Sequence, residues 1–88
     1  MNAVITVTGS DKVGIIAKVS AFLAERNINI VDISQTVLSG NFVMMMVVDL
    51  SPGRTLEAIK KELADLGASF GVSISMMHEK VFSAMHRV

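Results

Sequence analysis

Hydrophobic and polar residues follow two different periods along the chain, and the changes of period divide it into segments. Residues 3–8 are apolar on both alternating faces, which predicts a strand in the interior of a sheet. From about residue 13 to Arg26 the period becomes helical, with an apolar stripe that contains Ile16, Val19 and Leu23. Asn27 should end this helix, because asparagine tolerates the left-handed conformation of a C-terminal cap.

The middle of the chain contains a predicted β-hairpin. Residues 28–38 are rich in β-branched side chains, residues 42–50 are apolar almost throughout, and Ser39-Gly40-Asn41 between them is a turn signal. Because the second of these strands has no polar face, we expect it to lie inside the sheet.

A second helix and a fourth strand follow the break at Pro52-Gly53. Apolar residues recur at intervals of three and four from Leu56 to Phe70, with Gly67 as a weak point inside the helix and Gly71 placed to end it. Residues 72–77 alternate as in a half-exposed edge strand. Residues 81–88 hold Val81, Phe82, Met85 and Val88 in helical register, which predicts a short terminal helix buried against a sheet or a partner protomer.

The order of these elements is βαββαβ followed by a short helix. Two right-handed crossovers of this kind predict an α+β, ferredoxin-like fold: a four-stranded antiparallel sheet with both helices on one face. The other face would still be largely apolar, and a large exposed apolar face usually marks a binding surface. We therefore expect the terminal helix, a second protomer, or both to cover it.

Composition restricts the classes of function. With 88 residues, 51% of them hydrophobic, the chain is expected to form one domain with an aliphatic core. It has no cysteine, which excludes disulfides, thiolate metal sites and a thiol nucleophile. Eight basic residues balance eight acidic ones without clustering, which argues against nucleic acid or a membrane as the main partner. Without a signal segment or an apolar run long enough to span a bilayer, we expect a cytoplasmic protein.

The segment best suited to ligand binding is the turn between the first strand and the first helix, residues 7–15. A loop that leads into a helix N-terminus sets unpaired backbone N–H groups side by side, which suits a carboxylate or phosphate. Asp11 occupies the position expected for the helix N-cap, and Gly14 removes a side chain where a ligand or another backbone would approach. The alternative is an ordinary turn, with Asp11 as a cap and Gly14 for close packing, and for the turn alone this is the commoner case.

Other candidate chemistry is weaker. Met44-Met-Met46 suggests thioether copper ligation, but consecutive strand residues point to opposite faces, so core packing is the better interpretation. His78 and His86 follow methionines, yet solvated or locally hydrogen-bonded positions are favoured over a soft-metal site. No catalytic set of Ser, His and Asp or of paired carboxylates can be assembled, so we predict no catalytic residues, no metal and no cofactor.

Together, the loop Gly9-Ser-Asp-Lys-Val-Gly14, the helix after it, Asn29-Ile30 and the run Asp32-Ile-Ser-Gln-Thr36 resemble an ACT domain, the small-molecule-sensing module of amino-acid metabolism. The resemblance covers about residues 3–78 and leaves 79–88 as a helical tail. The run 32–36 and the ending Phe82-Ser-Ala-Met-His86 are most similar to short stand-alone ACT proteins related to the regulators of glycine cleavage.

This resemblance implies a homodimer or a higher even oligomer with an amino acid bound between protomers. The ligand would lie between the loop of one protomer and the start of the second strand of the other, and the implied ligand-binding residues are Gly9, Ser10, Asp11, Lys12, Val13, Gly14, Ile15 and Asn29. Backbone N–H groups at the helix N-terminus would hold an α-carboxylate, Asp11 an α-ammonium, and the Asn29 amide can donate and accept. The sequence departs from the best-known serine-sensing members at Gly9, where those members have an imidazole side chain.

The implied function is that of an amino-acid-sensing regulatory protein, not an enzyme, which acts as a dimer through contacts with a regulatory partner protein. The alternative is a ligand-free module that dimerises and docks on a partner. Other classes that use this fold fit worse. RNA-binding domains stack bases on sheet aromatics, whereas the four Phe residues here are dispersed, and metal chaperones require paired cysteines. An acylphosphatase-type enzyme requires an arginine near the first turn, and none is present there.

Overall fold

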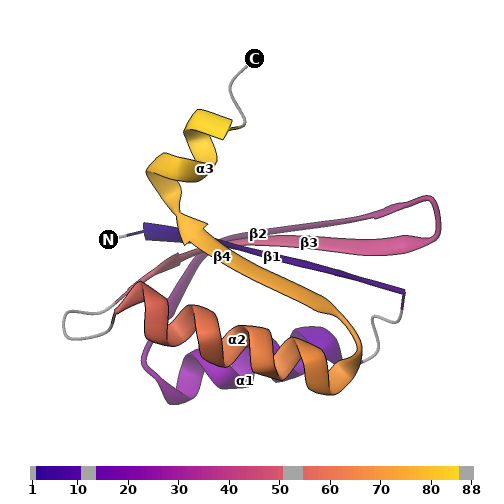
Figure 1. The fold of residues 1–88 in the computed structure, drawn as a ribbon, viewed down its shortest axis with the longest axis horizontal. Coiled ribbons are helices and arrows are strands. Elements are labelled where there is room, and N and C mark those ends of the chain that lie inside the picture. Colours follow the sequence, from indigo (N-terminus) through magenta and orange to yellow (C-terminus); the bar gives the residue numbers. More distant parts are fainter. Residues whose placement is uncertain (1, 11–13, 51–54, 86–88) are drawn as a thin grey trace.

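The computed structural model describes residues 2–10, 14–50 and 55–85. The elements in chain order are β1 (Asn2–Gly9), α1 (Ile15–Glu25), β2 (Asn29–Leu38), β3 (Asn41–Asp49), α2 (Leu56–Phe70), β4 (Ser73–His78) and α3 (Glu79–Met85) (Figure 1). The strands form one four-stranded sheet in the order β2-β3-β1-β4, and all neighbours are antiparallel. The predicted ferredoxin-like α+β fold is confirmed, with β1 and β3 inside the sheet and β4 at an edge.

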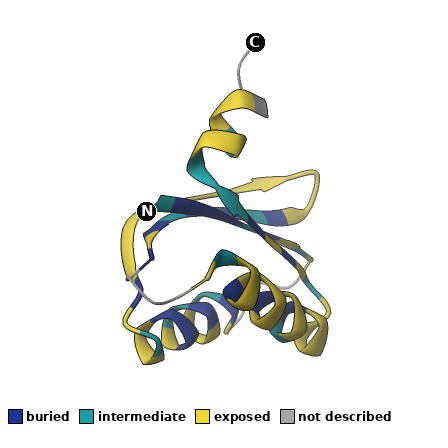
Figure 2. Ribbon diagram, turned by 60° about the vertical axis from the view of Figure 1, so that its left-hand side comes forward, coloured by how far each residue is buried: buried dark blue, intermediate teal, exposed yellow. Residues whose placement is uncertain are grey.

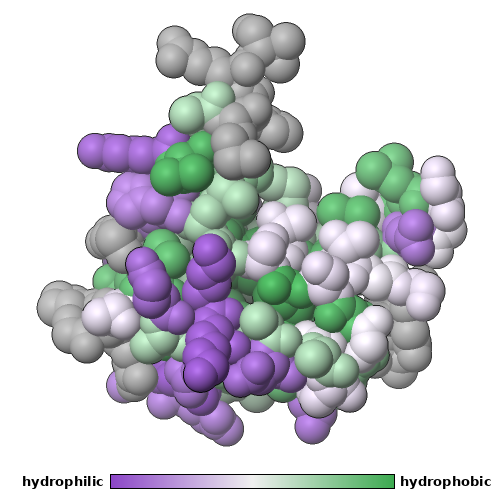
Figure 3. All heavy atoms as spheres, viewed as in Figure 1, coloured by the Kyte–Doolittle hydropathy of each residue, from purple (hydrophilic) through white to green (hydrophobic). Residues whose placement is uncertain are grey.

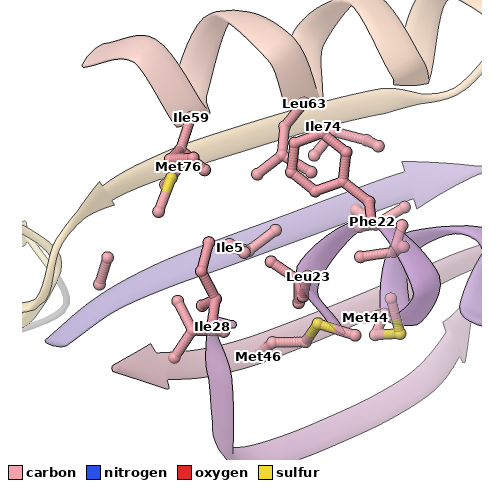
Figure 4. Packing of buried hydrophobic residues seen from close by; sticks show 14 of the residues in the cluster. Ile5, Phe22, Leu23, Ile28, Met44, Met46, Ile59, Leu63, Ile74 and Met76 are labelled. Carbon is pink, nitrogen blue, oxygen red and sulfur yellow. The ribbon is translucent and has the colours of Figure 1, made fainter. Parts of the chain in front are cut away.

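The core lies between the sheet and the helices α1 and α2, which both cover the same face (Figures 1 and 2). We call the opposite face of the sheet the outer face. On β3, Met44 and Met46 are fully buried in the core (Figure 4). Met45 between them is only half-buried on the outer face. The three consecutive methionines therefore pack on two sides of the sheet, and their interpretation as packing residues is confirmed. The core contains no buried polar or charged residue among those described.

Local signals set several helix ends. Asn27 has φ 56° just after α1, and Gly71 has φ 73° just after α2, so both adopt the left-handed conformation that the sequence predicted. Thr55 caps the other end of α2, where its hydroxyl accepts a hydrogen bond of 3.3 Å from the backbone N–H of Ala58.

The start of α1 differs from the prediction. The N-cap is Gly14, with φ 81°, and the helix begins at Ile15, so the expectation that Asp11 occupies the N-cap is wrong. A residue with positive φ cannot continue a right-handed helix backwards, and α1 therefore cannot start before Gly14. A Cβ added to Gly14 would meet no described atom within 4 Å. Gly14 is thus explained by its backbone conformation and not by close packing.

Gly67 is a packing requirement and not the weak point that the sequence suggested. It is buried in α2, and a Cβ there would lie 2.9 Å from Cγ1 of Ile74 and 2.9 Å from the carbonyl oxygen of Val72. The missing side chain allows α2 to approach β4 closely.

An ion pair joins the two covering helices at the end of α1. The guanidinium of Arg26 donates to the Glu62 carboxylate at 2.9 Å and lies 3.7 Å from the ring centroid of Phe22. The hydrogen bond to Glu62 raises the pKa of Arg26.

The terminal helix is confirmed, but its burial is only partial. α3 follows β4 without a loop and rises from the end of the sheet on the side opposite to α1 and α2 (Figure 1). Its main contacts within the described part of the chain are with β1 and β4. Phe82 is half-buried, whereas Val81 is 51% exposed, so the sheet of this protomer does not bury Val81. Burial of Val81 against a partner protomer stays a prediction. The side chain of Met85 and residues 86–88 lie outside the described part.

Candidate functional site

The predicted binding loop connects β1 to α1, and its described residues are Gly9, Ser10, Gly14 and Ile15. Asp11, Lys12 and Val13 lie outside the described residues. The first backbone hydrogen bond of α1 runs from Lys18 N–H to the carbonyl of Gly14 at 3.0 Å. The N–H groups that precede it in the first turn therefore point toward the loop, at the positive end of the helix dipole. The Ile15 side chain is 3% exposed and belongs to the core, so only its backbone can face a ligand.

Gly9, at the end of β1, packs against the connection between α2 and β4. A Cβ at Gly9 would lie 2.5 Å from Cγ1 of Val72 and 3.1 Å from its Cβ, far inside ordinary carbon–carbon contact. Val72 in turn packs against the core. The contact accounts for the absence of a side chain at Gly9.

Asn29 lies at the other end of the sheet from this loop. It is the exposed first residue of β2 and pairs with Asp49. Gly9 lies at the opposite end, where it pairs with Phe42 of β3. Phe42 pairs on its other side with Val37 of β2. The distance along β2 from Asn29 to Val37 is about 26 Å at the usual rise per strand residue. A single protomer therefore does not bring the loop and Asn29 together.

The strand that begins at Asn29 is an exposed sheet edge. All ten residues of β2 are exposed, and the strand pairs only with β3 within the described sheet. Large apolar side chains are uncovered along it: Ile30 39%, Val31 58%, Ile33 43%, Val37 59% and Leu38 61%. Figure 3 shows hydrophobic residues at the tip of the β2–β3 hairpin, at the right of the view, and hydrophilic ones over α2.

Natural proteins usually protect such an edge with lysine, proline or a short strand. β2 has neither residue type and carries one charge, Asp32. The hydrophobic pattern predicted a second protomer or the terminal helix on the apolar sheet face. The resemblance implied an interface at the start of the second strand, but the exposed edge as a whole was not singled out. The signal was available in the sequence as a long strand without lysine or proline.

Residues 2–77 match the ACT domain family. The chain belongs to that family. A UPF0237 protein of Listeria monocytogenes is 49% identical over the full length of both chains. An ACT domain protein from Streptococcus pneumoniae has a solved structure with a TM-score of 0.86 and 42% identity, which covers 98% of each chain. A protein assigned as a glycine cleavage system transcriptional repressor gives a TM-score of 0.79 at 22% identity, covers 85% of this chain and 44% of that one, and shows a shared fold.

These findings confirm the resemblance on which the site residues were named. Within the described part of this ACT domain, no group of three or more His, Cys, Asp or Glu residues could hold a metal ion. His78 accepts a hydrogen bond at Nδ1 from the backbone N–H of Lys80 at 3.0 Å, a local role of the kind that the sequence favoured. None of the helices in residues 2–10, 14–50 and 55–85 is both long and apolar enough to cross a membrane.

Proposed function

We propose that this ACT domain protein is a cytoplasmic amino-acid sensor that works as a homodimer through its β2 edge and has no catalytic activity of its own. The observation that carries the proposal is the exposed β2 edge, a long strand without lysine or proline that starts at Asn29. Pairing this edge with a second copy would satisfy its backbone groups and cover apolar side chains in one step.

The symmetry of such a pair favours a site shared between protomers. A two-fold axis perpendicular to the sheet places the strand beside its own copy with the two strands antiparallel. The start of the partner's β2, with its Asn29, then lies near Val37 at the far end of the first β2. That is the sheet end where Gly9 leads toward α1. Two residue groups that are far apart in one protomer would thus approach each other across the dimer.

The chemistry of the two groups suits an amino acid. The first turn of α1 offers backbone N–H groups to an α-carboxylate. Asn29 can donate to and accept from the ligand with one amide, and the sequence places Asp11 where it would pair with an α-ammonium. Ligand binding between protomers would then stabilise the dimer, which passes the signal to a regulatory partner protein.

The alternative is a ligand-free module that dimerises and docks on a partner. The observation in its favour is Gly9, which offers no side chain to a ligand and is crowded by Val72.

Light scattering combined with thermal melting in each of the twenty amino acids tests both candidates. We expect a mass twice the 9.4 kDa of the chain and one amino acid that raises the stability. A ligand that binds only the folded protein contributes about 2.7 kcal/mol at a hundredfold excess over its Kd. A dimer that no amino acid stabilises would favour the ligand-free module, and a monomer at micromolar concentration would refute the proposal.

A matched pair of variants identifies the interface. Val37→Lys introduces a charge on the β2 edge, and Val81→Lys introduces the same charge on α3 at a similarly exposed valine (59% and 51%). We expect Val37→Lys to give monomers and Val81→Lys to stay dimeric. The opposite result would place the dimer contact at α3 and exclude the β2 edge.

A further inference from the structure

The outer face holds a cavity that is separate from the β1–α1 loop. Its volume is about 350 Å³, and it lies between α3 and the strands β1, β2 and β3. Its floor and wall are apolar and consist of Val4, Met45, Val47 and Phe82. Val4 is only 3% exposed although it lies on the outer face, because α3 contacts β1 there. This outer-face cavity has the size and apolar lining of small-molecule sites.

An irregularity in β2 places a carboxylate at this cavity. β2 pairs Ile30 with Val48 and then Asp32 with Val47, so Val31 is an extra residue between the two pairs. With strict alternation from Ile30, Asp32 would share the helix-covered face. The bulge instead places it on the outer face with Val47, and bulges often re-aim a side chain in this way beside functional sites. The carboxylate oxygen Oδ1 of Asp32 accepts the backbone N–H of Ile33 at 2.9 Å, which orients the group.

The charges that the described residues bring to the cavity have one sign. The charged lining residues in this part of the chain are Asp32 from β2 and Glu79 from α3, and both are acidic. The hydroxyls of Ser34 and Ser83 add neutral hydrogen-bonding groups. Two carboxylates beside an apolar floor attract an organic cation and repel a carboxylate. An ammonium group could reach the carboxylates while an apolar body covers Met45 and Phe82.

We propose that the outer-face cavity is a second ligand site, which binds a small primary amine that has an apolar body and lacks a carboxylate. The site is distinct from the loop and Asn29, and it does not depend on the amino-acid sensing proposed above. The two sites differ in the ligand they select, because the cavity should reject the carboxylate that an amino acid offers to the N-terminus of α1.

Three probes of similar shape test the proposal: 2-phenylethylamine, 2-phenylethanol, which lacks the ammonium, and phenylalanine, which adds a carboxylate. The full chain is labelled with ¹³C at its methionine methyl groups and titrated in an NMR tube. Met45 lies at the cavity floor, whereas Met44 and Met46 lie in the core on the other side of the same strand and act as internal controls. We expect the amine to shift the Met45 signal and leave Met44 and Met46 unchanged, and we expect the alcohol and phenylalanine to bind at least about tenfold more weakly.

Two variants with one charge removed complete the test. Asp32→Asn keeps the oxygen that accepts the Ile33 N–H, so the fold should persist, and it should weaken amine binding at least about tenfold. Asp65→Asn removes an exposed carboxylate on α2, far from the cavity, and should leave binding unchanged.

Three results would overturn the proposal. The first is the absence of any amine-dependent shift of Met45. The second is equal binding of amine, alcohol and phenylalanine. The third is a Met45 shift that follows protein concentration without any probe, because a second copy of the chain would then be the occupant of the cavity.

Discussion

The contact between Gly9 and Val72 allows a quantitative test of how the end of β1 is held. Replacing a strand glycine with alanine ordinarily stabilises a protein by about 0.5–1 kcal/mol, because glycine has more freedom to lose on folding. At Gly9, however, the new Cβ would lie 2.5 Å from Cγ1 of Val72. Ordinary contacts between carbon atoms lie at about 3.5–4.0 Å. The branched carbon is close to its own backbone and cannot move away freely, so we expect Gly9→Ala to destabilise the protein by about 1–3 kcal/mol.

The matched control removes the closest contact. Val72→Ala deletes Cγ1 and leaves Cβ, which would lie 3.1 Å from the new Cβ, so Gly9→Ala should cost much less in that background. Urea unfolding at one fixed protein concentration measures the free energy of unfolding of all four proteins in the cycle. We expect a coupling free energy of about 1–3 kcal/mol between the two sites. If Gly9→Ala is as stable as the wild type, or if the two changes are additive, the close contact does not hold β1 in place.

Three further predictions concern Gly67, Gly14 and Arg26. Glycine to alanine in an exposed helix ordinarily stabilises it by about 1 kcal/mol. Gly67→Ala should instead lower the free energy of unfolding by about 1–3 kcal/mol, because the new Cβ meets Ile74. An unchanged or higher melting temperature would contradict this. Gly14→Val should cost at least about 1–2 kcal/mol because φ is 81° at that position, and should remove the response to the sensed amino acid; undiminished calorimetric binding would exclude the loop from the site. Arg26→Ala should lower the free energy of unfolding by about 1 kcal/mol in urea, because it removes the packing on Phe22 and the bond to Glu62. Arg26→Lys should restore only part of this stability. Full recovery would show that the charge alone is sufficient.

The sequence determined those features that depend on neighbouring residues. The periods of two and 3.6 separate strands from helices, and the absence of a polar face identified β3 as interior. Asn27 and Gly71 end their helices in the left-handed conformation because this requirement is local to one residue. The resemblance carried by the loop and by residues 29–36 likewise identified the ACT family without any coordinates.

The features that the sequence did not reveal arise between segments far apart in the chain. The sequence of the loop is compatible with an N-cap at Asp11 or at Gly14, and the acidic residue was the better candidate by residue type. Only the backbone angle at Gly14 distinguishes the two. The extra residue Val31 is invisible in a pattern of alternating β-branched residues, since only the register against β3 reveals a bulge.

Burial and close contact were decided by the tertiary structure for the same reason. The role of Gly9 depends on Val72, which is far away in the chain, and no local pattern reports how closely two such segments approach. The exposure of the whole β2 strand follows from its place at the sheet edge, and the exposure of Val81 follows from the direction in which α3 leaves β4. An apolar side chain records a tendency to be buried, but whether something covers it depends on the position of every other element in the fold and on the partners that the fold can bind.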